Sequence, residues 1–157
     1  MAGTLLLVNM IPKSLSGESE QDSEPMLTVN PNNSQQIVGT AFTPNPTGGS
    51  LAPVYVSTDG GQTWTLNSIV PGGEITGDIT VAFGPQSNNL YAGILRMPQP
   101  QQDTELNILR TKTFQAATPM QVLVDRFGSD QPFIQSSIGG SGASATDRVY
   151  VGDNDFD

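Results

Sequence analysis

The 157-residue chain has a net charge of −9 and contains neither histidine nor cysteine. These absences exclude Ser-His-Asp and Cys-His catalysis, haem and zinc-cluster ligation, and disulfides, and the lack of clustered cations excludes recognition of a nucleic-acid backbone. Seventeen glycines and twelve prolines, with only 13% charged residues, are typical of an all-β protein built from short strands.

The chain opens with an apolar run at residues 5–8. The run is too short to span a bilayer, and no basic residue precedes it, so it predicts a buried strand rather than a membrane span or a signal peptide. The acidic stretch that follows at residues 18–24 predicts a solvated connection into the next element.

From residue 24 onward, an extended segment, a polar turn and a second extended segment recur, with a step of 53 positions from residue 37 to residue 90. The extended segments are expected at 24–31 and 37–42, at 78–85 and 90–95, and at 130–134 and 149–152. A further strand pair follows the first two copies, at 53–56 with 64–66 and at 106–109 with 114–124. Four strands per repeat of about fifty residues are typical of β-propeller blades.

This repeat predicts a domain plan with four parts. The parts are an N-terminal closing strand with an acidic connection at 1–23, a first blade at 24–76, a second blade at 77–129 and the first half of a third blade at 130–157. A propeller closes its ring with about four to eight blades. We therefore expect either that the chain is part of a longer protein or that several copies assemble, with residues 4–10 as the closing strand in the first case.

The turn of the first blade contains the motif S-x-D-x-G-x-T-W, formed by Ser57, Asp59, Gly61, Thr63 and Trp64. Asp59 is expected to accept hydrogen bonds from the amides of its own turn. Gly60 and Gly61 permit a positive φ, and Trp64 is expected to pack back over the hairpin. The motif therefore predicts a structural role for these residues and not an active site.

With this motif and the repeat, the chain resembles the BNR/Asp-box repeat proteins, which include sialidases and non-enzymatic relatives. The resemblance implies a sialidase-like propeller, an outer third-to-fourth-strand position for the Asp-box, and an extracellular or cell-surface location. The second box is expected to be degenerate, because the step of 53 puts Arg110 and Lys112 at the places of Ser57 and Asp59. Phe114 is expected to stand in for Trp64.

The same resemblance implies what a sialidase site would need, namely an arginine triad, a Tyr/Glu nucleophile pair and an aspartate acid/base. The first arginine of the triad precedes Ile-Pro at the opening of the first blade, where this chain has Ser23 followed by Glu24 and Pro25. No arginine occurs before Arg96. Guanidinium groups match carboxylates in a planar, bidentate way that other residues do not reproduce, so the sequence disfavours sialidase activity.

Acidic residues stand at the expected blade openings instead: Asp22, Glu24, Asp78 and Asp130. If these carboxylates meet at the mouth of a central channel, they could bind a hard cation such as Ca²⁺ or act as a pair in glycoside cleavage. The simpler interpretation, in which they bond local amides and face solvent, is favoured. Asp153, Asp155 and Asp157 resemble the start of a calcium loop, but the downstream Gly and Glu of such a loop are missing, so metal binding there is disfavoured.

Three functions follow from these features. The preferred hypothesis is a non-catalytic propeller that binds carbohydrate or a protein partner. The first alternative is a sialidase-like glycoside hydrolase whose catalytic residues lie mostly downstream of this chain. The second alternative is a structural subunit that pairs with other copies through open blade edges.

Overall fold

Ten strands form three antiparallel sheets in a computed structural model that describes residues 5–10, 23–42, 50–98 and 103–155. Within these residues the only helix is a single 3-10 turn at Gly142–Ser144, so the prediction of an all-β fold is confirmed. No helix of the described chain is long and apolar enough to cross a membrane.

Each sheet is a meander in which strands consecutive in sequence pair side by side. The first sheet contains β1 (Ser23–Val29), β2 (Ile37–Phe42), β3 (Val54–Ser57) and β4 (Thr65–Asn67). The second contains β5 (Ile75–Phe83), β6 (Leu90–Met97), β7 (Glu105–Thr111) and β8 (Gln121–Phe127). The third contains β9 (Ser129–Gly139) and β10 (Thr146–Asp155).

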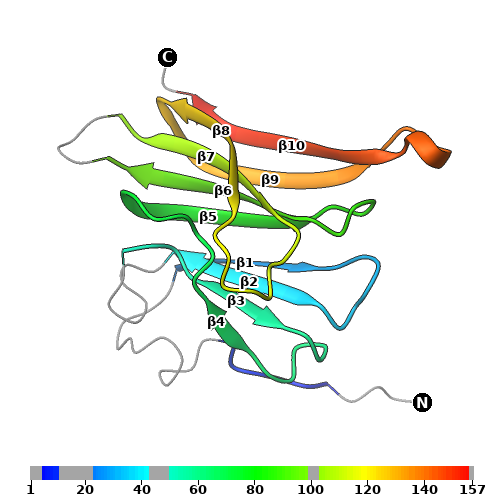
Figure 1. Cartoon of the computed structure of the whole chain (residues 1–157). Helices are drawn as coiled ribbons and strands as arrows, with labels where there is room; N and C mark the ends of the chain where they lie inside the picture. Colours follow the sequence, from blue (N-terminus) through cyan, green and yellow to red (C-terminus); the bar gives the residue numbers. More distant parts are fainter. Residues whose placement is uncertain (1–4, 11–22, 43–49, 99–102, 156–157) are drawn as a thin grey trace.

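The three sheets stack face to face, with the second sheet between the other two (Figure 1). Their first strands are neighbours, because β5 contacts both β1 and β9. Strands β5 and β6 are therefore covered on both faces, which explains why their apolar residues run almost without interruption.

Two apolar layers hold the stack together. Between the first and second sheets, Ile79, Val81 and Phe83 of β5 pack in one cluster with Val38 and Val54. Between the second and third sheets lies a smaller cluster of Ala82, Tyr91, Leu106, Ile108 and Ile134. The alternation of β5 side chains between the two layers follows from the two-residue period of a strand.

Because β5 is the edge of its own sheet, some of its backbone groups need partners outside the ladder. The N–H of Phe83 donates to Oγ1 of Thr28 on β1 at 3.3 Å. Oγ of Ser136 on β9 donates to the Phe83 carbonyl at 2.5 Å. Side chains of the neighbouring first strands thus satisfy both backbone groups of Phe83 and join the three strands at this position.

The N-terminal run does not form the buried strand expected for it. Residues 5–9 belong to none of the three sheets, and Leu5, Leu6 and Leu7 are exposed. A single extended segment is stable as a strand only when a sheet edge pairs with it, and none of the described sheets does so. The role of residues 4–10 in closing a ring stays a prediction.

Candidate functional site

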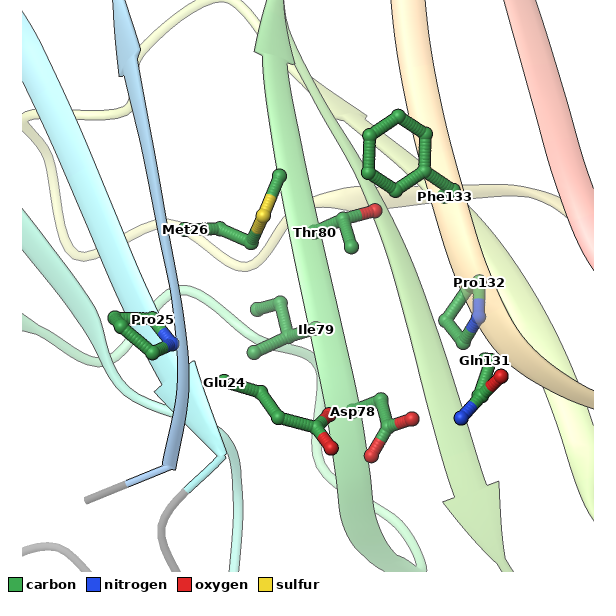
Figure 2. A pocket seen from close by; sticks show the side chains of 9 residues that line it. All are labelled: Glu24, Pro25, Met26, Asp78, Ile79, Thr80, Gln131, Pro132 and Phe133. Carbon is green, nitrogen blue, oxygen red and sulfur yellow. The ribbon is translucent and has the colours of Figure 1, made fainter.

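Equivalent positions on the first strands of the three sheets line one pocket of 410 Å³ (Figure 2). The lining residues are three triplets: Glu24, Pro25 and Met26 on β1; Asp78, Ile79 and Thr80 on β5; and Gln131, Pro132 and Phe133 on β9. The pocket is therefore a product of the repeat, because each sheet contributes the same short stretch of its first strand.

A β-bulge in each first strand turns these side chains toward the pocket. The pairing register shifts by one residue between Ser23 and Met26 on β1, between Thr76 and Ile79 on β5, and opposite Gly152 to Asn154 on β9. A bulge bends its strand and re-aims the local side chains. Residues of all three bulges line the same pocket, so the re-aimed side chains face a common space.

Two of the bulges hold a non-glycine residue in the left-handed region. Glu24 has φ 50° and Gln131 has φ 49°, a conformation that costs about 1–3 kcal/mol at a non-glycine residue. A proline follows each of them, Pro25 and Pro132, and proline suits a bulge because it donates no ladder hydrogen bond. Strain of this kind concentrates at ligand sites.

The carboxyl groups of Glu24 and Asp78 point toward one another at one end of the pocket (Figure 2). A hydrogen bond between two carboxyl groups requires a proton on one of them. Burial raises the pKa of Asp78, and the negative charges of Glu24 and Asp130 raise it further. Two facing carboxylates are unfavourable unless a proton or a cation lies between them.

The other two acidic candidates do not line the pocket. Asp130 lies one residue before the lining position, and its Oδ1 accepts a hydrogen bond from the N–H of Gln131 at 2.9 Å. Gln131 takes the place equivalent to Glu24, because a proline follows both residues in a bulge. Asp22 lies outside the described residues. The structure thus brings together Glu24 and Asp78, and it gives Asp130 a local amide, as the simpler interpretation expects.

Apolar side chains and one hydroxyl complete the pocket, and sequence reasoning missed them. Phe133 is half-exposed at 51% at the end away from the carboxyl groups, and Thr80 lies between it and Met26. Thr80 is only 6% exposed, and its Oγ1 has no hydrogen-bond partner among the described residues. A sequence pattern could have identified them, because Met26, Thr80 and Phe133 each lie two residues after the acidic or amide residue of their repeat.

The Asp-box hairpin between β3 and β4 is held by its own side chains. The N–H groups of Gln62 and Thr63 both donate to Oδ1 of Asp59 at 3.0 Å, and the Thr63 hydroxyl donates to Oδ2 at 2.6 Å. Ser57 Oγ donates to Oδ1 at 2.8 Å. Nε1 of Trp64 donates to the Gly61 carbonyl at 3.0 Å, which closes the turn.

Because of these hydrogen bonds, the contribution of Asp59 to stability is expected to depend on pH. Hydrogen bonds from the Thr63 hydroxyl, the Thr63 amide and Ser57 lower the pKa of Asp59 from 3.8 to about 2. A depressed folded-state pKa contributes stability above the unfolded value, and that stability disappears as the pH falls through the folded value. We expect Asp59→Asn to destabilise the protein at pH 5, and the difference from wild type to shrink between about pH 4 and pH 2.

Denaturant unfolding at a series of pH values measures this difference. The exposed Asp103 provides the control, because Asp103→Asn makes the same charge change outside the box. If the difference in free energy of unfolding between wild type and Asp59→Asn stays constant down to pH 2, the carboxylate charge does not stabilise the hairpin.

In the second sheet, the register of the degenerate box differs from the one expected. Thr111 pairs with Leu90 as Ser57 pairs with Ile37, so Thr111 and not Arg110 takes the place of Ser57. The span from Leu90 to Thr111, over β6, its connection and β7, is one residue longer than the span from Ile37 to Ser57, which moves the box by one position. Oγ1 of Thr111 accepts from the Thr113 N–H at 3.0 Å, a neutral remnant of the Asp59 network.

Phe114 was expected to stand in for Trp64, but it does not pack over its own hairpin. It is buried in the layer between the first two sheets, with its ring 5.1 Å from that of Phe83 at an interplanar angle of 79°. The longer β7–β8 connection gives Phe114 the reach to enter this layer. The edge-to-face contact is a favourable arrangement of aromatic rings.

The C-terminal acidic residues pair with an arginine and not with one another. Nη1 of Arg126 on β8 lies 3.1 Å from Oδ2 of Asp153, and Nη2 forms an ion pair with Asp155. Asp157 lies outside the described residues. Within the described part of the chain, no group of three or more acidic side chains is close enough to hold a metal ion.

Searches against protein-family models, curated proteins and solved structures find no match to this chain.

Proposed function

We propose that this chain is part of a sialidase-like β-propeller that binds carbohydrate without catalysing a reaction on it. Propeller blades are four-stranded meanders whose first strands line a central channel. Two four-stranded meanders and a two-stranded one, with β5 beside both β1 and β9, support this architecture. The Asp-box hairpin supports the same proposal, because it joins the third and fourth strands of its sheet, the connection implied by the BNR/Asp-box resemblance.

The pocket on β1, β5 and β9 is the observation that supports a carbohydrate ligand. A sugar has an apolar C–H face and a rim of hydroxyl groups, and small-molecule sites match such ligands with apolar walls and a few placed polar groups. Phe133 and Met26 offer the apolar surface, and the acceptors of Glu24, Asp78 and Gln131 lie across the pocket from them. A half-exposed ring such as Phe133 is suited to stack against a sugar face.

The geometry of the acidic pair argues against glycoside cleavage. The two carboxyl groups of a glycosidase stand about 5–10 Å apart, so that the scissile bond and a water or nucleophile fit between them. The carboxyl groups of Glu24 and Asp78 instead point toward one another at one end of the pocket, and a hydrogen bond with Glu24 contributes to the raised pKa of Asp78. No arginine lines the pocket, so a substrate carboxylate has no guanidinium partner there.

Binding of the protein to a panel of immobilised glycans tests the proposal. We expect at least one glycan to bind, and Phe133→Ala to weaken that binding about tenfold because the stacking surface is lost. Tyr150→Ala is the matched control. Tyr150 is 53% exposed on β10, close to the 51% of Phe133, but it does not line the pocket, so its replacement should leave binding unchanged.

Two results would contradict the proposal. Equal losses in Phe133→Ala and Tyr150→Ala would mean that sugars do not bind in this pocket. Turnover of a fluorogenic sialoside by the wild-type protein, abolished by Asp78→Asn, would establish the hydrolase alternative in place of simple binding.

A further inference from the structure

We propose that the sugar bound in this pocket carries a free amine, whose ammonium group lies between the carboxyl groups of Glu24 and Asp78. This inference rests on the proposed function and names the ligand class: a glucosamine-type residue with an unacetylated nitrogen.

The charge of the pocket favours a cationic ligand. None of the nine lining residues is Lys or Arg, and the whole chain carries a net charge of −9. Two close carboxylates are unfavourable unless a proton or a cation lies between them. An ammonium group has three donors and can lie between the two carboxylates and bond both of them.

An unpaired hydroxyl in the same pocket is a second, independent indication of a polar ligand. Thr80 lies two residues from Asp78 on β5, is 6% exposed, and has an Oγ1 with no partner among the described residues. In Figure 2 this oxygen points across the pocket toward the wall formed by Pro132 and Phe133. A buried hydroxyl without a partner costs about 1–3 kcal/mol, so a sugar hydroxyl that reaches Thr80 would regain part of that energy.

The arrangement of the walls fits an amino sugar better than the other acidic-site ligands. A sugar ring against Phe133 would present a substituent toward the carboxyl groups at the opposite end of the pocket (Figure 2). Sialic acid would bring its own carboxylate to that end, where Glu24 and Asp78 repel it. Ca²⁺ requires about six to eight oxygen ligands, and no set of three acidic side chains in the described chain meets in one place.

Calorimetric titration with two disaccharides tests this inference. The first is a β-linked glucosamine dimer, and the second is the same dimer with both nitrogens acetylated, measured at mildly acidic pH and about 0.15 M salt, where long-range attraction is screened. We expect the free amine to bind at least about tenfold more tightly. The double variant Glu24→Gln, Asp78→Asn should bind the two sugars equally, and Asp103→Asn should keep the wild-type preference.

Each outcome decides a different point. Equal binding, or tighter binding of the acetylated dimer, overturns this inference and leaves the proposed function standing. No binding of these or of any sugar in the glycan panel overturns both. A preference for the amine that persists in the double variant reflects the acidic surface as a whole and also overturns the inference. If circular dichroism shows that the double variant is unfolded, Glu24→Gln alone, at an exposed residue, allows the same comparison.

Discussion

Replacing Arg96 with methionine is expected to lower the free energy of unfolding by about 2–4 kcal/mol, because a buried hydrogen-bonded charge is removed and its partners stay behind. Arg96 on β6 is only 3% exposed. Its Nη1 donates to the Glu74 carbonyl at 3.2 Å, its Nη2 to the Pro71 carbonyl at 2.9 Å, and its Nε to Oδ1 of Asn107 at 2.5 Å.

The surroundings of Arg96 explain the size of this effect. Burial lowers the pKa of Arg96, and the negative charges of Glu74, Glu105 and Asp125 oppose that shift. Asn107 connects the network, since its Nδ2 donates to both Glu105 and Asp125 at 2.8 Å. Without the guanidinium group, two carbonyls lose their donor and the nearby acids lose their compensating cation.

Denaturant unfolding of Arg96→Met measures the loss, and Arg110→Met on the neighbouring strand is the control. Arg110 is only partly buried, and its Nη2 donates to Oε1 of Gln121 at 2.8 Å. Its replacement is expected to cost no more than about 0.5 kcal/mol. Equal losses in the two variants would mean that the buried network does not stabilise the second sheet.

Adding a single methyl group at Gly84 is expected to cost about 2–3 kcal/mol, through overpacking and lost hydrogen bonds. A Cβ at this position would lie 2.1 Å from Oδ2 of Asp147 on β10. That carboxylate is held by the turn between β5 and β6: it accepts from the Gln86 and Ser87 amides at 2.8 and 3.2 Å and from the Tyr91 hydroxyl at 3.0 Å. Gly84→Ala therefore displaces a carboxylate that ties the third sheet to the second.

A double-mutant cycle isolates this contact. In an Asp147→Ala background the clash disappears, so Gly84→Ala should cost at least about 1 kcal/mol less than it does in the wild type. Gly72→Ala serves as the control, because a Cβ at Gly72 would meet no atom within 4 Å. A cost for Gly84→Ala that is the same in both backgrounds would contradict the proposed clash.

Local features of this protein were predictable from the sequence, while positions set by pairing between distant segments were not. The strand expected at 37–42 coincides with β2 (Ile37–Phe42), and the strand expected at 90–95 lies within β6 (Leu90–Met97). The register of the second box was not predictable, because the span from Leu90 to Thr111 is one residue longer than the span from Ile37 to Ser57, which puts Thr111 in the place assigned to Arg110. A fixed repeat step assumes strand pairs of equal length, and a single extra residue breaks that assumption.

In the candidate site, too, some residues were predictable from the sequence and others were not. Glu24 and Asp78 were identified because acidic residues open the repeats, but the third position is Gln131 and not Asp130. Whether one residue or its neighbour faces the pocket depends on a bulge, since a one-residue shift turns a strand side chain to the other face. The partner of Asp153 was equally hidden, because Arg126 lies 27 residues away on another strand.

By itself the sequence determined the all-β class and the residues of the Asp-box, because both depend on composition and on contacts within a few residues of the chain. Asp59 bonds Gln62 and Thr63, three and four positions away. Only the tertiary structure decided which side chains line the pocket, which box residue replaces Ser57 and which acids find a cation. These features depend on how the strands pair and how the three sheets stack. The packing energy of the stack comes from contacts between residues that are far apart in the sequence.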